Sequence, residues 1–117
     1  MHMNNKYTPK VSICIPTFNA ADTINETLNS IFSQTFTDYE LLIVDNCSTD
    51  DTIKIASTFV DSRLQIIINK TNIGAEGNFE KCFQIAKGLY TAIYHSDDIY
   101  APRIIEKQVN YLDNVTE

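Results

Sequence analysis

Two adjacent carboxylates, Asp97 and Asp98, are the residues of this chain whose type and position could do chemistry. They follow an apolar, strand-like run from Leu89 to Tyr94, and a helix-like segment begins near Pro102. A strand that ends in paired acids presents hard oxygen ligands at the edge of a sheet, which suits Mg²⁺ or Mn²⁺ carrying phosphate oxygens. The pair also has a structural interpretation, because the dipole of a following helix favours acidic residues at its start.

Polar segments also follow two earlier strand-like runs. The run Val11–Pro16 leads into Thr17-Phe18-Asn19, and the run Tyr39–Val44 leads into Asp45-Asn46. The second segment could simply end its strand in an Asx turn. It could instead hydrogen-bond the edge of a nucleotide base or a ribose.

Helical patterns alternate with the strand-like runs. Apolar residues recur at helical spacing near residues 24–32, 53–60, 79–86 and 104–112, and a third strand-like run covers Leu64–Ile68. We expect a loop from Asn69 to Gly77 and a left-handed helix end at Gly88. This alternation predicts an α/β fold, a Rossmann-like, mostly parallel sheet with helices on both faces. Ligands of such folds bind outside the carboxyl ends of the strands, so the three polar segments are predicted to form one site.

The composition excludes several classes of protein. A chain of 117 residues makes one domain at most, and a formal charge of -6 argues against a nucleic-acid partner, which needs clustered basic residues. No apolar run approaches the roughly 20 residues that span a bilayer. Residues 1–10 are interpreted as an extension or tag remnant without the apolar core of a signal peptide, and residues 11–117 as the functional part.

Cys14, Cys47 and Cys82 are an odd number of cysteines without zinc-like spacing. Cys14 lies in a strand-like run and Cys82 on the apolar side of a helical pattern, so both are expected to be buried. Free thiols fit a reducing compartment, and the prediction is a cytoplasmic protein.

Two common phosphate-binding motifs are missing. Gly74 and Gly77 are followed neither by GxGxxG nor by a Lys-Ser/Thr pair, which argues against dinucleotide binding and a P-loop. His95 is interpreted as a strand-end residue, or as a hydrogen-bond donor to a metal ligand, and not as a ligand itself, since imidazole is not the usual partner of Mg²⁺.

Taken together, three segments in order resemble a known family. VSICIPTFNA, SIFSQTFTDYELLIVDNCSTD and NIGAEGNFEKCFQIAKGLYTAIYHSDDIYAP are similar to the N-terminal half of the family-2 inverting nucleotide-sugar glycosyltransferases of GT-A fold. The resemblance covers nearly the whole chain from Val11 onward. The variant Asn72-x-Gly74-x-x-x-Asn78-Phe79 looks most like bacterial members that build surface polysaccharides.

The resemblance implies a role for each matching position. Thr17 and Phe18 would border the base, and Asp45 or Asn46 would recognise it. Asn78 falls where many relatives have Ala-Arg-Asn, with Gly77 in place of the arginine. The implied nucleotide-binding residues are Thr17, Phe18, Asn19, Asp45, Asn46, Asn78 and Asp97, and the implied metal ligands are Asp98 and Asp97.

The implied reaction moves a sugar from a nucleoside diphosphate to an acceptor hydroxyl with inversion at the anomeric carbon. Mn²⁺ or Mg²⁺ would neutralise the charge on the diphosphate, and a general base would deprotonate a sugar or lipid-linked acceptor. The base is not identifiable in this chain, so we expect a truncated fragment that binds donor and metal but does not turn over. Its uncovered sheet edge could support a homodimer, and the full-length protein could lie peripherally at the inner face of the membrane.

Two other classes remain open from the sequence. One is a non-catalytic nucleotide-binding module. The other is an unrelated α/β phosphotransfer domain of the receiver kind, which would need a lysine after a late strand, and the fourth strand-like run has none after it.

Overall fold

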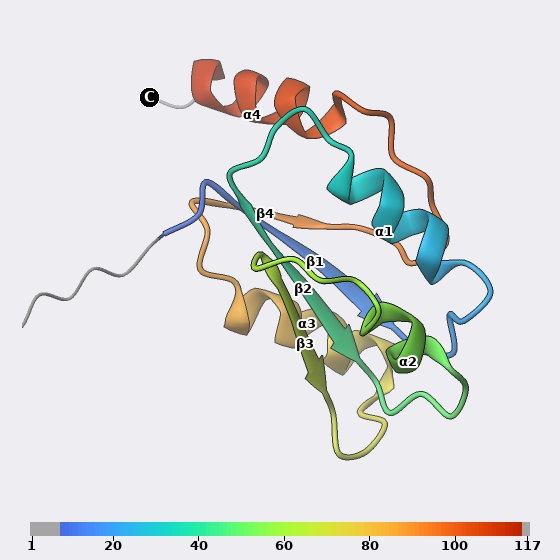
Figure 1. Ribbon diagram of the computed structural model, residues 1–117. Helices are drawn as coiled ribbons and strands as arrows, with labels where there is room; N and C mark the ends of the chain where they lie inside the picture. Colours follow the sequence, from blue (N-terminus) through green and yellow to red (C-terminus); the bar gives the residue numbers. More distant parts are fainter. Residues whose placement is uncertain (1–7, 116–117) are drawn as a thin grey trace, which may run out of the picture.

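The computed structural model of the chain describes residues 8–115 as a four-stranded sheet with helices on both faces (Figure 1). The strands are parallel and lie in the order β3-β2-β1-β4. The predicted α/β class is therefore confirmed. The elements in chain order are β1 (Val11–Thr17), α1 (Ile24–Phe32), β2 (Tyr39–Asp45), α2 (Thr52–Ala56), β3 (Leu64–Ile68), α3 (Gly74–Ile85), β4 (Tyr90–Ile93) and α4 (Ile104–Val115).

Each face of the sheet has its own apolar core. Ile13 and Ile43 point toward the core that α1, α2 and α4 cover, whereas Cys14 and Leu42 point to the other face and pack with Cys82 of α3. Because both faces are covered, the central strands β1 and β2 are apolar throughout rather than alternating. The predicted burial of the Cys14 and Cys82 thiols is confirmed.

The order of the strands locates the edge at which a ligand can bind. From β1 the chain adds β2 and then β3 on one side, and β4 returns to the opposite side of β1. Strand order therefore reverses next to β1, and parallel α/β sheets bind ligands outside the carboxyl ends of the strands at such a point. All three predicted polar segments follow the carboxyl ends of β1, β2 and β4.

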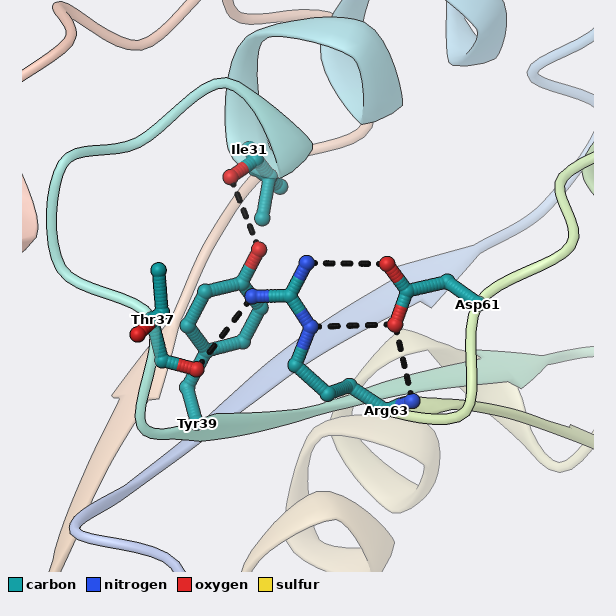
Figure 2. Close-up of polar contacts among 5 residues, drawn as sticks. All are labelled: Ile31, Thr37, Tyr39, Asp61 and Arg63. Carbon is teal, nitrogen blue, oxygen red and sulfur yellow. Dashed lines mark hydrogen bonds and ion pairs between the residues drawn. The ribbon is translucent and has the colours of Figure 1, made fainter.

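The opposite, amino ends of β2 and β3 are fixed by Arg63 (Figure 2). The guanidinium donates to both carboxylate oxygens of Asp61, at 3.0 and 2.8 Å, and to the carbonyl of Thr37 at 3.2 Å. It also lies 4.4 Å from the ring centroid of Tyr39, whose hydroxyl donates to the carbonyl of Ile31 at 2.9 Å. The hydrogen bond from Arg63 lowers the pKa of Asp61, and burial raises the pKa of Tyr39 to about 12. This cluster joins the end of α1 to the start of β2, away from the carboxyl edge.

Two local predictions are wrong in the segment that leads to β4. The predicted loop Asn69–Gly77 ends early, because α3 begins at Gly74, whose positive φ of 83° glycine adopts without strain. Gly88 is not a left-handed helix end: α3 ends at Ile85, and the following Ala86 is extended. Glycine is required at position 88 because a Cβ there would lie 2.5 Å from the backbone nitrogen of Ser12.

The predicted extension, residues 1–10, lies mostly outside the described residues. Of its last residues, Pro9 accepts a hydrogen bond from the N–H of Leu89 at 3.2 Å, and Lys10 accepts one from Tyr90 at 2.9 Å. The Lys10 ammonium also lies 3.0 Å from the carboxylate of Asp113. Pro9 and Lys10 therefore continue the pairing between β1 and β4.

The close approach at Gly88 gives a testable pair of variants. Gly88→Ala is expected to destabilise the fold by about 2–3 kcal/mol, because the clash is with backbone atoms that have no room to move. Gly77→Ala is the matched control within α3, since its Cβ would meet Ile73 at an ordinary 3.5 Å. Alanine should stabilise that helix by about 0.5–1 kcal/mol. Urea unfolding measures both, and equal effects of the two substitutions would contradict the packing described for Gly88.

Candidate functional site

The loops after β1 and β2 are joined through the buried carboxylate of Asp45. Thr17 lies opposite Asp45 in the parallel register, and its hydroxyl donates to Asp45 Oδ1 at 2.7 Å. Ser48 donates from its N–H to Oδ2 at 2.8 Å and from its hydroxyl to Oδ1 at 2.6 Å. Asp45 is only 1% exposed, so these three donors replace the water that its charge loses on burial. The carboxylate of Asp45 therefore holds the end of β1 and the loop after β2 together.

Asn19 connects the same two loops from the outside. The Oδ1 of Asn19 accepts hydrogen bonds from the backbone N–H groups of Thr49, at 2.8 Å, and Asp50, at 3.3 Å. The backbone N–H of Asn19 donates to the Ser48 hydroxyl at 2.9 Å. Asn19 has a φ of 51°, a left-handed conformation that asparagine tolerates better than most residues. The loop after β1 thus has a fixed shape beside Phe18.

The side chain of Asn46 uses its full hydrogen-bonding capacity within the protein. Its Nδ2 donates to Asn72 Oδ1 at 2.9 Å and to the Gly74 carbonyl at 3.1 Å. Its Oδ1 accepts the N–H of Ile73 at 2.9 Å and the Nδ2 of Asn69 at 3.1 Å. An asparagine amide has two donors and two acceptor lone pairs, so all four are occupied. Asn46 therefore fixes the start of α3 against the end of β2.

Asn78 extends this polar network beneath α3. Its Nδ2 donates to the Val44 carbonyl at 2.8 Å, and its Oδ1 accepts from Asn69 at 2.8 Å. The ammonium of Lys81 donates to Asn69 Oδ1 at 2.6 Å. Neither Asn69 nor Asn72 was among the predicted site residues, although Asn72 belongs to the Asn72-to-Phe79 motif. Asn69 directly follows β3, just as Asn46 directly follows β2, and this position is the signal that could have identified it.

A cavity of about 320 Å³ opens above this network, between the ends of β1 and β2 and the first turns of α3. Phe18 and Phe79 line it and are each about half exposed, at 50% and 44%. Aromatic and small side chains thus form its walls, and the buried asparagines form its base. The lining residues are Pro16, Thr17, Phe18, Asn46, Asn72, Ala75, Asn78 and Phe79.

The structure therefore brings together four of the predicted nucleotide-binding residues. Thr17, Phe18, Asn46 and Asn78 line this cavity, whereas Asp45 and Asn19 hold the loops that shape it. The cavity-lining position of Phe79 was not predicted, although Phe79 belongs to the Asn72-to-Phe79 motif.

Asp97 and Asp98 lie on a separate loop, residues 95–101, which we call the acidic loop. It begins beside β1, because the N–H of Tyr94 still donates to the Cys14 carbonyl at 2.8 Å. The rings of Tyr94 and Tyr100 stack with centroids 4.0 Å apart, and the N–H of His95 donates to the Tyr100 hydroxyl at 2.7 Å. Both ends of the loop are thereby held together, at the same sheet edge as the cavity.

The two carboxylates are exposed on the acidic loop, unlike the buried one of Asp45. Burial raises the pKa of Tyr94 to about 12, and burial together with the nearby Asp98 carboxylate raises the pKa of Tyr100. Both phenols stay neutral at neutral pH, so Asp97 and Asp98 supply the negative charge of this loop.

This donor set fits a hard divalent cation that keeps other ligands. Within residues 8–115, no three His, Cys, Asp or Glu side chains gather closely enough to enclose a metal. Mg²⁺ and Mn²⁺ do not need such a cage, because Mg²⁺ in particular is usually held by one or two carboxylates with waters and substrate phosphates. Two exposed neighbouring carboxylates at a sheet edge match that mode of binding.

A second, larger hollow of about 530 Å³ lies between β4 and α4. Its walls include Val11, Ile93, Ile105 and Leu112. β4 is an end strand of the described sheet, so one side of its backbone pairs with no strand there. This face is apolar and lies apart from the cavity at the carboxyl edge.

The fold and the site define the class of doubly wound α/β proteins that bind ligands at the carboxyl edge of a parallel sheet. Residues 12–116 match the family model described as Glycosyl transferase family 2. The chain belongs to this family of glycosyltransferases, which confirms the predicted resemblance and excludes the receiver-like phosphotransfer class.

Individual relatives agree with this assignment. The UDP-Glc:alpha-D-GlcNAc-diphosphoundecaprenol beta-1,3-glucosyltransferase WfaP of Escherichia coli is 40% identical over 103 residues, which are 88% of this chain and 41% of that protein. The crystal structure of S. aureus TarS 1-349 in complex with UDP superposes with a TM-score of 0.83 and 28% identity, over 90% of this chain and 32% of that one. The mannosyltransferase PcManGT from Pyrobaculum calidifontis, solved with GDP-Man and Mn²⁺, gives a TM-score of 0.77 and 26% identity, over 95% and 33% of the two chains.

The chain thus spans about two fifths or less of the length of these proteins. The neighbours show that this fold occurs in proteins solved with UDP and with GDP-Man and Mn²⁺.

The saturated amide of Asn46 predicts the effect of its closest replacement. Asn46→Asp removes both donors and places a carboxylate against the oxygens of Asn72 and Gly74, so the fold should lose about 1–3 kcal/mol. Asn25→Asp is the matched control, because Asn25 is exposed in the first turn of α1, where the helix dipole favours an added negative charge. Denaturant unfolding should show no loss of stability for the control. Equal stability of the two variants would contradict the network.

Proposed function

We propose that this chain is the donor-binding part of a glycosyltransferase that moves a sugar from a nucleoside diphosphate to an acceptor hydroxyl with inversion. The observation that carries the proposal is the position of the cavity. It opens at the carboxyl edge of the sheet, lined by an exposed phenylalanine on each side, next to a loop with two exposed carboxylates. The neighbours solved with UDP and with GDP-Man support a nucleotide as the occupant.

In this proposal the nucleotide base occupies the cavity between Phe18 and Phe79. Aromatic rings bind bases by stacking, whichever base is present. The side chains of Asn46 and Asn78 are engaged within the protein, so they shape the cavity instead of reading the base by themselves. Asp45 and Asn19 contribute indirectly, through the loops that they hold.

The diphosphate would lie toward the acidic loop, with Asp98 and Asp97 as ligands of Mn²⁺ or Mg²⁺. When bound, the cation would neutralise the negative charge that develops on the leaving diphosphate. The carboxylates of Asp98 and Asp97 would hold the cation, and Asp97 would also contact the ribose. No described residue is assigned as the general base that deprotonates the acceptor, and absence of transfer by the 117-residue chain stays a prediction.

The biological setting is proposed from the relatives. The name of WfaP includes a sugar linked to diphosphoundecaprenol, which is a lipid-linked acceptor. The putative teichuronic acid biosynthesis glycosyltransferase TuaG of Bacillus subtilis is 34% identical to this chain over 108 residues. We therefore propose a role in bacterial surface polysaccharide synthesis on a sugar or lipid-linked acceptor, at the cytoplasmic face of the membrane. Within residues 8–115, no helix combines the length and apolar character needed to cross a bilayer. The homodimer stays a prediction.

The aromatic walls of the cavity can be tested without metal. Phe79→Ala should weaken binding of UDP or GDP about tenfold in the presence of EDTA, because loss of one base–aromatic stack costs about 1–3 kcal/mol. Tyr111→Ala is the control, on α4: Tyr111 is 67% exposed and does not line the cavity. Its substitution should change affinity much less. If calorimetry finds the same loss of affinity for both variants, the proposal that the nucleotide base occupies this cavity is wrong.

The role of the acidic loop has its own test. UDP or GDP should raise the melting temperature more with Mn²⁺ than with EDTA, because a ligand that binds only the folded state stabilises it. Asp98→Asn should abolish this metal-dependent increment and leave the melting temperature without ligand nearly unchanged, since Asp98 is exposed. Glu80→Gln, an equal loss of charge on the exposed side of α3, should retain the increment. A normal increment in Asp98→Asn would contradict metal binding at this residue.

A further inference from the structure

Helix α1 has a polar stripe directly beside its apolar one. Ile24, Leu28 and Ile31 are fully buried against the sheet. The residue before each of them is polar and has a hydroxyl, and one residue corresponds to about 100° around a helix. A second set of side chains at helical spacing therefore faces the acidic loop. We call this set the polar stripe of α1; its members are Thr27 and Ser30 within the helix, Thr23 just before its first residue and Gln34 two residues after its last.

The first two members of the polar stripe hold the backbone on both sides of Asp97. Thr23 Oγ1 donates to the Ser96 carbonyl at 2.8 Å. Thr27 Oγ1 lies 2.7 Å from the Asp98 carbonyl and 2.9 Å from the Ser96 carbonyl, and Thr27 is only 1% exposed. Two successive threonines thus restrain the carbonyls that flank the acidic pair.

The last two members hold the segment that leads from the acidic loop into α4. The hydroxyl of Ser30 accepts the N–H of Tyr100 at 3.0 Å. Gln34 donates to the Ala101 carbonyl at 2.7 Å and accepts the N–H of Ile105 at 3.2 Å. Gln34 is 6% exposed, so these bonds are protected from water and hold the loop more firmly than exposed ones would.

These bonds are made to the backbone of the acidic loop and, at Ile105, of the start of α4, and the two carboxylates remain exposed. Such an arrangement fixes the backbone from which the two carboxylates project and leaves the carboxylate oxygens accessible. We infer that the polar stripe of α1, with Thr27 at its centre, positions the Asp97 and Asp98 carboxylates for a divalent cation and the diphosphate that it carries. This inference rests on the proposed function, and Thr27 is a positioning residue because it acts through the carboxylates.

The test measures affinity for UDP and for GDP by calorimetry, with Mn²⁺ and separately with EDTA. In Thr27→Val the gain in affinity given by Mn²⁺ should fall by about tenfold or more, as is usual when a group that orients a metal ligand is removed. The affinity with EDTA should be unchanged, because the cavity between Phe18 and Phe79 does not include Thr27. Thr27→Ser keeps the hydroxyl and should restore the gain.

Two further variants separate positioning from a general loss of structure. Thr58→Val removes another hydroxyl-to-carbonyl bond, from Thr58 in the turn after α2 to Ile55 at 2.6 Å, and should leave the Mn²⁺ gain intact. Ser30→Ala removes the acceptor of the Tyr100 N–H at a less buried position, so it should fold even if Thr27→Val does not, and should reduce the Mn²⁺ gain.

The possible outcomes distinguish this inference from the proposed function. If the unaltered chain shows the Mn²⁺ gain and both Thr27→Val and Ser30→Ala keep it in full, the inference is wrong and the proposed function stands. If the unaltered chain binds nucleotide with no gain from Mn²⁺, the metal role of the acidic loop and the inference are both overturned. Equal losses with Mn²⁺ and with EDTA in Thr27→Val would assign Thr27 to the fold alone.

Discussion

The structure depends on satisfying polar groups that a parallel sheet buries at its carboxyl edge. The ends of β1, β2 and β3 meet there, and the chain must leave each strand through a loop that crosses its neighbours. Asp45 and Asn46 are 1% and 3% exposed, yet every side-chain nitrogen and oxygen buried within residues 8–115 has a hydrogen-bond partner. A buried polar group left without a partner costs about 1–3 kcal/mol. The loops after the strands are therefore restricted to the shapes that these bonds permit.

This constraint separates the residues that build the site from the residues that can contact a ligand. Asp45, Asn46 and Asn78 are engaged within the protein, and a ligand could use their side chains only by breaking internal bonds. Phe18, at 50% exposed, and the exposed carboxylate of Asp97 are open to a ligand, and the exposed carboxylate of Asp98 also hydrogen-bonds the Tyr100 side chain. The buried polar residues make a rigid base, and the exposed residues on it are oriented before any ligand arrives. Binding then costs less conformational entropy.

The features that depend on local pattern were predictable from the sequence. The apolar runs of β1 and β2 and the helical spacing in α1 and α4 predicted the parallel α/β fold, and the carboxyl-edge rule placed Thr17, Asp45 and Asp97 on one edge. Features that depend on contacts distant in sequence were not predictable. Gly88 looked like a helix end, but what requires glycine there is the backbone of Ser12, 76 residues earlier. Asn69 and Asn72 do lie in the loop between β3 and α3, but their hydrogen bonds to Asn46 and Asn78 could not be predicted. These partners come within reach only once α3 packs on β2.

Helix α1 shows how stability and site geometry become linked in such a fold. Its apolar stripe packs on the sheet, so the position of the helix is fixed by the same burial that drives folding. Its polar stripe lies one residue away around the axis, and any shift of the helix on the sheet would also move the bonds to the Ser96 and Asp98 carbonyls. The helix therefore holds the acidic loop to the core through these hydrogen bonds, in addition to the packing of Tyr100 on Tyr94. Because the like charges of the neighbouring Asp97 and Asp98 repel each other, this support of the loop backbone opposes their separation.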